Sequence, residues 1–165
     1  VERSRGLGDV YKRQPDMSEK IQIGKAKVVR EGKKIAILNF GARLNECLIA
    51  EENLRKKGVN ATIVDARFAK PLDENLIWQL ATNHEVIITI EEGSIGGFGA
   101  HVSNFLNDKN LLDSNLKFRS MILPDKFIDQ DKPENMYKSA GLDALSIENK
   151  VLEVLNSKVI VKKIN

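Results

Sequence analysis

Apolar residues form short continuous runs that alternate along the chain with segments of helical spacing. Residues 35–40 (IAILNF) form a nearly continuous apolar run, and two further segments, 61–68 (ATIVDARF) and 85–92 (EVIITIEE), are mostly apolar in their central positions. Runs of this kind are typical of strands that are buried on both faces of a sheet. Residues 26–30 and 116–123 are further candidate strands, so the pattern predicts a sheet of several strands.

Helical spacing of apolar residues predicts helices after these strands. The expected helices cover residues 43–57, a segment that opens at 71–73, residues 100–107 and residues 146–156. In the first helix, Cys47 and Leu54 are expected to face the core and Glu51 to face water. Asp73 is a candidate N-cap, because its carboxylate can accept hydrogen bonds from the free amides of the first turn. Alternating strands and helices predict an α/β fold with parallel βαβ units and helices on both faces of the sheet.

Both ends of the chain depart from this pattern. Residues 1–20 are charged and show no sustained period of 2 or 3.6, so we expect a disordered or artefactual tail outside the domain. Residues 21–157 form the expected domain. Residues 158–165 form a basic tail, whose three lysines equal the whole formal charge of +3. The body is therefore neutral and a poor electrostatic match for a polyanion, and we expect no nucleic-acid partner.

Composition indicates the class of protein and excludes several kinds of site. With 42% hydrophobic and 30% charged residues, the chain has the composition of a globular domain. No apolar run approaches the ~20 residues of a membrane span, so no membrane association is expected. Cys47 is the single cysteine, which excludes an internal disulfide and a cysteine metal cluster. We expect a cytoplasmic location and assign no metal site.

The glycine-rich segment 93–99 (GSIGGFG) lies between a predicted strand and a predicted helix. Phosphates bind at such positions in α/β folds, where glycines let the backbone approach the ligand. Position 102 is valine where a dinucleotide-binding loop needs glycine or alanine, and no Gly-Lys-Ser/Thr follows, which excludes a P-loop. Close packing of this loop is therefore favoured over a phosphate or other ligand contact, which stays open.

Charged residues stand at the carboxyl ends of two predicted strands. Glu91 and Glu92 are adjacent in one strand and point to opposite faces, so they do not form a converging catalytic pair. A hydrogen bond to a helix terminus or to another domain is favoured for them. Arg67 and Lys70 lie in the charged segment 65–73, which runs out of the other strand. They can bind an anion or pair with Asp65, Asp73 or a neighbouring domain, and pairing is the favoured alternative.

Neither histidine indicates a catalytic group by its position. His84 is expected in a surface loop, because it precedes a strand. His101, in the first turn of a helix beside the glycine loop, is the better candidate for a site. Ser94 lacks the strand-to-helix turn of a nucleophile elbow, so a hydrolase triad has no support.

Several segments, taken together and in order, resemble one enzyme family. They are residues 23–26 (IGKA), 36–41 (AILNFG), 64–73 (VDARFAKPLD), 89–92 (TIEE), 96–99 (GGFG), 123–128 (LPDKFI) and 141–143 (GLD). Through them, residues 21–157 resemble the C-terminal domain of 1-deoxy-D-xylulose-5-phosphate synthases, which are thiamine-diphosphate enzymes of the transketolase group. The resemblance implies a three-layer α/β/α fold with a mixed five-stranded sheet, whose first strand is antiparallel.

The resemblance also implies a reaction to which this chain contributes indirectly. The synthases condense pyruvate with glyceraldehyde 3-phosphate in isoprenoid precursor synthesis. In that family thiamine diphosphate, magnesium and both substrates lie between the first two domains, whose motifs are missing from this chain. We therefore expect no catalytic, cofactor-binding or metal-binding residue here, and an isolated chain that is inactive. The expected partners are the first two domains of the synthase, in a homodimer.

In the family the third domain packs on the other domains and helps to shape the dimer. The matching loops here are 67–73 and 91–99. The residues expected to make interdomain or dimer contacts are Arg67, Lys70, Asp73, Glu91, Glu92, Gly96, Gly97, Phe98, Gly99 and His101. Two alternatives stay open: the equivalent domain of another transketolase-group enzyme, such as a 2-oxoacid dehydrogenase beta subunit, and a free-standing ligand-binding or interaction module.

Overall fold

The fold was analysed in a computed structural model that describes residues 20–156. The expectations for residues 1–19 and for the basic tail 158–165 lie outside the described residues. In chain order the elements are β1 (Lys27–Arg30), β2 (Ile35–Phe40), α2 (Leu44–Lys56), β3 (Ala61–Asp65), α3 (Glu74–Asn83), β4 (Val86–Glu91), α4 (Phe98–Asp108), the 3₁₀ helix η1 (Leu111–Asp113), β5 (Lys117–Met121), α5 (Pro133–Ala140) and α6 (Ala144–Asn156).

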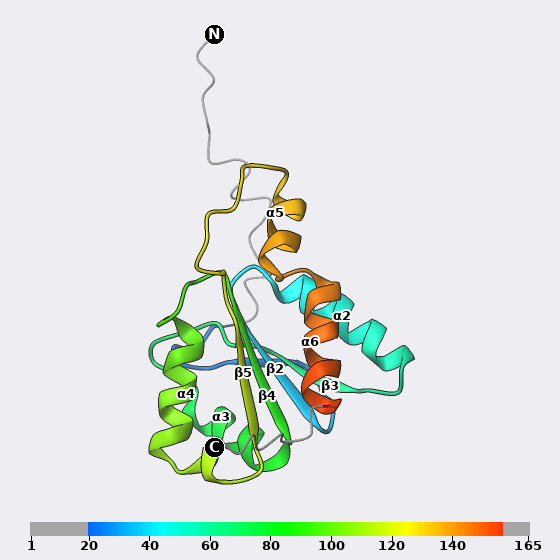
Figure 1. Ribbon diagram of the computed structural model, residues 1–165. Coiled ribbons are helices and arrows are strands. Elements are labelled where there is room, and N and C mark those ends of the chain that lie inside the picture. The colour runs from blue at the N-terminus through cyan, green and yellow to red at the C-terminus, as the bar shows by residue number, and fades with distance from the viewer. Residues whose placement is uncertain (1–19, 157–165) are drawn as a thin grey trace, which may run out of the picture.

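The strands form one mixed sheet of five strands in the order β1-β3-β2-β4-β5 (Figure 1). Strand β1 runs antiparallel to β3, with Lys27 opposite Asp65. The other neighbours are parallel, and Ile35 of β2 stands opposite both Ala61 of β3 and Val86 of β4. The expected α/β fold, including the antiparallel first strand, is confirmed.

Helices cover both faces of the sheet and enclose two separate cores (Figure 1). On one face, α2 and α6 pack on alternate strand residues such as Ile37 and Ile88. On the other face, α3 and α4 pack on the intervening residues, such as Leu38 and Ile87. Because successive strand residues point to opposite faces, the continuous apolar runs of β2 and β4 supply both cores. The short helix α5 lies beyond the carboxyl ends of the strands.

Several boundaries differ from those predicted. The strand predicted over 61–68 ends at Asp65, because the backbone turns there and the Phe68 amide donates to the Ala66 carbonyl at 2.5 Å. The helix predicted over 100–107 already begins at Phe98, since the buried Glu91 side chain accepts the first amides of that helix. Neither α5 nor η1 was predicted.

The prediction that Glu51 of helix α2 faces water is wrong. The Glu51 side chain is fully buried. Its Oε1 accepts from both Nε and Nη2 of Arg55, at 3.0 and 2.7 Å, and its Oε2 lies 3.7 Å from Arg30 Nη1 of strand β1. Two arginines therefore cover a carboxylate at the border of the helix face. Cys47, by contrast, is buried as expected, and burial raises the pKa of its thiol to about 12.

Candidate functional site

The residues singled out by sequence lie along one edge of the sheet, where its parallel strands end. Arg67, Lys70 and Asp73 follow β3, whereas Glu91, Glu92 and the glycine loop follow β4. The loop after β5 joins them, because the Leu123 amide donates to the Gly93 carbonyl at 2.9 Å. We refer to this region, formed by residues 20–26, 65–73, 91–101 and 122–135, as the carboxyl edge.

Glu91 organises the glycine loop from inside the domain. Its side chain is 4% exposed, and its two carboxylate oxygens accept from the Phe98 and Gly99 amides at 2.9 and 2.8 Å. These are free amides of the first turn of α4, where the helix dipole favours an anion. The place that a phosphate would take at this helix is thus filled by a carboxylate of the chain itself. The expected bond to a helix terminus is confirmed.

The glycines of the loop leave room for that carboxylate. A Cβ atom at Gly93 would lie 2.6 Å from Glu91 Oε2, and one at Gly97 would also collide with the carboxylate. At Gly99 a Cβ would lie 2.7 Å from Thr89 Oγ1 and 2.6 Å from Ser120 Oγ, so α4 rests directly on β4 and β5. Close packing therefore explains these three glycines.

Phe98 completes the inner side of the loop. It is 2% exposed, and its ring stacks on Phe40 with the centroids 5.2 Å apart. The loop faces water through Ile95, which is 79% exposed, and through the exposed Gly96 at φ 97°. A cavity of about 200 Å³ lies between the loop, α4 and β5. The outward part of the loop is therefore formed by Ser94, Ile95 and Gly96, and Ile95 is its one large apolar side chain.

Glu92 points to the other face and joins a different cluster. Its Oε1 forms an ion pair with Arg43 Nε at 2.8 Å. The Arg43 guanidinium in turn lies 3.5 Å from the centre of the Tyr137 ring of α5. A hydrogen bond from the Tyr137 hydroxyl to the Glu92 carboxylate raises the pKa of that hydroxyl. The cluster fastens α5 over the end of β4, beside a cavity of about 400 Å³ that both cationic and anionic side chains line.

Asp73 is used within the domain as well. One carboxylate oxygen caps α3 by accepting from the Leu76 amide at 3.2 Å, as predicted. The other oxygen accepts a hydrogen bond from the Ala26 amide at 3.1 Å. Lys25 Nζ lies 3.4 Å from Asp73 Oδ1, the oxygen that caps the helix. Asp73 therefore ties the start of β1 to the start of α3, and its ion-pair partner is Lys25 rather than the neighbouring Lys70.

Arg67 occupies a strained turn. Its φ of 58° is in the left-handed region, and it is the central residue between the Ala66 carbonyl and the Phe68 amide, which is a γ-turn. Its Nε lies 3.7 Å from Asp65 Oδ2, so the predicted pairing with a neighbouring acid is confirmed. Lys70 is exposed on the same segment.

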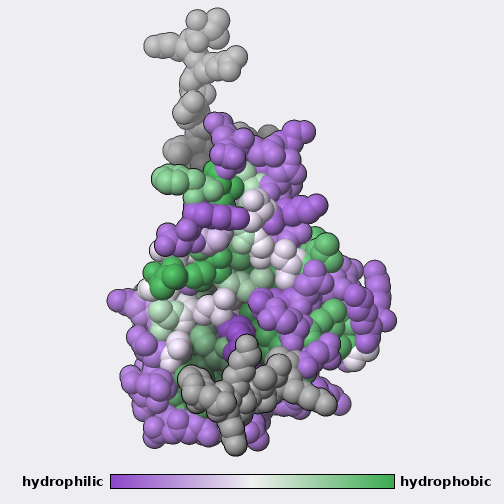
Figure 2. Space-filling model, viewed as in Figure 1, coloured by the Kyte–Doolittle hydropathy of each residue, from purple (hydrophilic) through white to green (hydrophobic). Residues whose placement is uncertain are grey.

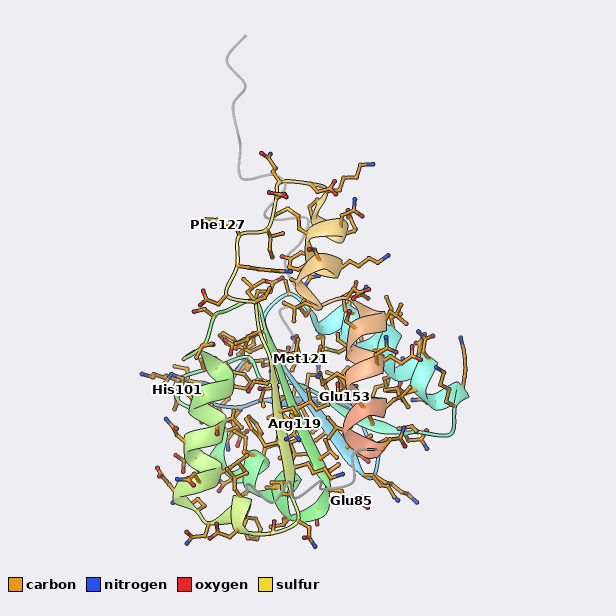
Figure 3. The ribbon with its side chains drawn as sticks, viewed as in Figure 1. Glu85, His101, Arg119, Met121, Phe127 and Glu153 are labelled. Atoms are coloured by element: carbon orange, nitrogen blue, oxygen red, sulfur yellow. The ribbon has the colours of Figure 1, made fainter. Side chains whose placement is uncertain are left out.

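The two histidines lie in different environments. His101 is half-buried on α4 and is seen at the side of that helix in Figure 3. His84 is not an exposed loop residue as expected, since it caps the end of α3 and is half-buried. Its Nδ1 lies 3.0 Å from the Leu80 carbonyl and its Nε2 2.8 Å from Thr62 Oγ1. Burial lowers the pKa of His84, so the imidazole is favoured in its neutral form.

Sequence reasoning missed the most exposed apolar residue of the carboxyl edge. Phe127, in the loop after β5, is 104% exposed and points away from the ribbon in Figure 3. In the sequence, Phe127 is an aromatic residue among charged ones in a segment without a regular period. Such a pattern does not show whether the side chain is exposed or belongs to the core. Arg43 and Tyr137 were also missed as site residues, because they lie far apart in the sequence.

The described part of the chain was searched for metal-binding groups and for membrane-spanning helices. Among residues 20–156, no group of three or more histidine, cysteine, aspartate or glutamate residues is placed to hold a metal ion. Within the same residues, every helix is too short or too polar to span a membrane.

Comparison with known proteins identifies related domains. Residues 24–147 match the model of the family "Transketolase, C-terminal domain". A split-gene transketolase, solved as an inactive beta4 tetramer, aligns with 26% identity and a TM-score of 0.75 over 84% of this chain and 44% of its own. Transketolase from Campylobacter jejuni subsp. jejuni NCTC 11168 aligns with 19% identity and a TM-score of 0.56 over 79% of this chain and 18% of its own. The chain thus spans less than half the length of either protein.

Proposed function

The chain belongs to the transketolase C-terminal domain family, and from that membership we propose that it is the third domain of a 1-deoxy-D-xylulose-5-phosphate synthase. In this role it supplies packing surface to the cofactor-binding domains and carries no catalytic group. The finer assignment within the family is supported by the order of its motifs, above all residues 64–73 and 89–99.

One observation carries the non-catalytic role. The two motif carboxylates of the carboxyl edge, Glu91 and Asp73, each accept two backbone amides of the domain itself. A carboxylate that is fully engaged in this way is not available to move protons or bind a metal ion. What the edge offers to a partner instead is the apolar surface of Ile95 and Phe127.

The cofactor of the family does not fit the residues present. The start of α4, which suits a diphosphate by its dipole, is filled by the Glu91 carboxylate. A bound anion would have to displace that buried charge. We therefore propose that thiamine diphosphate and magnesium bind to the first two domains of the synthase and that this chain alone binds neither.

Reconstitution tests the proposal. The purified chain is mixed with the first two domains of a 1-deoxy-D-xylulose-5-phosphate synthase, and product is measured from pyruvate and glyceraldehyde 3-phosphate with thiamine diphosphate and magnesium. We expect no turnover by either part alone and turnover by the mixture. Turnover by the chain alone, or a mixture no more active than its parts, contradicts the proposal.

The similarity to a split-gene transketolase favours a second candidate, the equivalent domain of another transketolase-group enzyme. The same reconstitution separates the two. If the remaining domains of a transketolase, or those of a 2-oxoacid dehydrogenase, regain activity with this chain and the synthase domains do not, the second candidate replaces the first.

A further inference from the structure

A cavity lies at the opposite end of the sheet from the carboxyl edge, where the parallel strands begin. Its volume is about 340 Å³, which is within the range of small-molecule sites. Residues 33–35, residues 58–60 and Leu155 near the end of α6 line it, and we refer to it as the amino-end cavity. Figure 2 shows mostly hydrophilic surface at this lower end of the view, so a cavity with apolar walls is unusual in these surroundings.

The wall of the amino-end cavity is formed by apolar side chains of the core. Ile35, the first residue of β2, is fully buried. Val59 and Leu155 are half-buried and pack against the same core. Gly58, at φ 79°, adds no side chain, and a Cβ atom there would meet no atom within 4 Å. A ligand in this cavity therefore contacts Ile35, Val59 and Leu155 and finds open space at Gly58.

Hydrogen bonds within the domain hold the backbone around the cavity in place. The Gly58 and Val59 amides donate to carbonyls of the last turn of α2, both at 3.0 Å. The Lys33 amide donates to the Asn60 carbonyl at 3.2 Å, which fixes the turn before β2 against the segment before β3. The walls are thus formed before any ligand arrives, and binding has a low cost in ordering.

The charged side chains that line the cavity are both cationic. Lys33 and Lys34 are exposed, and no acidic side chain of the described residues lines the cavity with them. Within residues 20–156, Lys33 Nζ has no partner in an ion pair or hydrogen bond. Lys34 Nζ lies 3.7 Å from Glu85 Oε1, in a pair whose side chains are 70% and 64% exposed. Such a pair is weak, so Lys34 can exchange Glu85 for another anion.

We propose that the amino-end cavity binds a small organic anion with an apolar body, of which an aliphatic carboxylate is the simplest kind. The anionic head pairs with Lys33 and Lys34, and the apolar body packs on the wall of the cavity. Apolar contact supplies most of the affinity, because an ion pair at an exposed site contributes little. The charge supplies the selection, since an uncharged molecule of the same shape loses both lysine contacts. The cavity lies away from the carboxyl edge, so the proposal does not depend on the synthase role.

Octanoate is the probe that tests the proposal. Octan-1-ol serves as the uncharged molecule of the same length, and acetate serves as the anionic head without the apolar body. Each is titrated into the full chain labelled with ¹⁵N, and the amide chemical shifts are followed by NMR. We expect octanoate to give saturable shifts at Ile35, Gly58 and Val59. Octan-1-ol is expected to bind about 10-fold more weakly, and acetate to give no saturable shift.

Substitutions separate the contribution of charge from that of the apolar wall. The double variant Lys33→Met and Lys34→Met is expected to weaken octanoate binding about 10-fold and to leave octan-1-ol binding unchanged. Val59→Ala is expected to weaken both about 3-fold, because it removes apolar contact alone. The matched control is the double variant Lys126→Met and Lys138→Met, which removes two exposed lysines at the other end of the sheet and changes neither affinity. The dispersion of the amide signals shows that each variant is folded.

Three results overturn the proposal. Octanoate that gives no saturable shift shows that the cavity does not take this class of ligand. Octanoate binding that survives the loss of Lys33 and Lys34, or that octan-1-ol equals, removes the role of the two lysines. Octanoate shifts that fall on residues 157–165 and not on Gly58 and Val59 place the anion on the basic tail instead. None of these results bears on reconstitution of the synthase, so the two proposals fail independently.

Discussion

The two faces of the sheet bury carboxylates in different ways. On the α3–α4 face, Glu91 is held by two backbone amides. On the α2–α6 face, Glu51 and Glu148 are buried, but their partners Arg55 and Lys57 are side chains that are 50% and 55% exposed. A backbone amide cannot leave without unfolding its helix turn, whereas an exposed ammonium or guanidinium group can exchange the carboxylate for water. The Glu91 carboxylate therefore holds the glycine loop in place, whereas the basic partners of Glu51 and Glu148 cover these carboxylates on the helix surface.

The largest expected effect comes from Glu91→Gln. The substitution removes the charge and points an amide NH₂ group at one of two buried N–H donors, so we expect a loss of about 3 kcal/mol in the free energy of unfolding. Urea denaturation measures it. Glu85→Gln is the control, because Glu85 directly precedes the same strand and its ion pair with Lys34 is exposed, and it is expected to cost less than about 1 kcal/mol. Equal losses at the two positions contradict the comparison.

Gly99→Ala is expected to have the next largest effect, about 2 kcal/mol. Its Cβ would lie within 2.7 Å of Thr89 Oγ1 and 2.6 Å of Ser120 Oγ, so α4 has to move away from the sheet. Thermal unfolding of Gly99→Ala, Ser120→Ala and the double variant checks this reason. The double variant should lose less stability than the sum of the two single changes, since Ser120→Ala removes the nearest atom.

Glu148→Gln, on the α2–α6 face, is expected to cost only about 1 kcal/mol, because Lys57 can turn to water when its partner is neutral. The same exposure makes the contact sensitive to salt. Unfolding measured with and without 1 M NaCl should show the cost of Glu148→Gln shrinking in salt, while the cost of Glu91→Gln stays the same. A cost at Glu148 that does not change in salt refutes the assigned difference between the faces.

The smallest expected effect is a change in the pH dependence of stability on replacing His84. Burial lowers its pKa in the folded chain, so the unfolded chain takes up the proton first as pH falls. Stability contributed by neutral His84 is therefore complete above the ordinary pKa of about 6.5 and declines as the pH falls below it. Urea midpoints at pH 7.5 and 5.5 are compared for wild type and His84→Gln. The variant should lose less stability between these pH values than the wild type does.

Much of the fold follows from local pattern. The continuous apolar runs of β2 and β4 fixed two central strands, because only a strand covered on both sides needs apolar residues at successive positions. The position of Asp73 before a helical segment predicted its cap, since capping is a contact between near neighbours in the chain. The opposite directions of Glu91 and Glu92 follow from the two-residue period of a strand.

Contacts between distant residues were beyond the reach of local pattern. The burial of Glu51 depends on Arg30 of β1, which is brought over α2 by the position of the antiparallel edge strand. The cluster of Arg43, Glu92 and Tyr137 joins three segments that the sequence separates widely. Helix α5 was missed because none of its residues is buried, which leaves little periodic signal.

The sequence by itself therefore determined the α/β fold, the central strands and the position of the glycine loop, because each of these depends on the spacing of residues that are close together in the sequence. Only the tertiary structure decided the use of that loop. Its glycines surround the Glu91 carboxylate, which fills the helix terminus where a phosphate could otherwise bind. The physical reason is that an anion site and an internally capped helix have the same local sequence pattern. They differ only in whether the fold brings an acidic side chain to the helix.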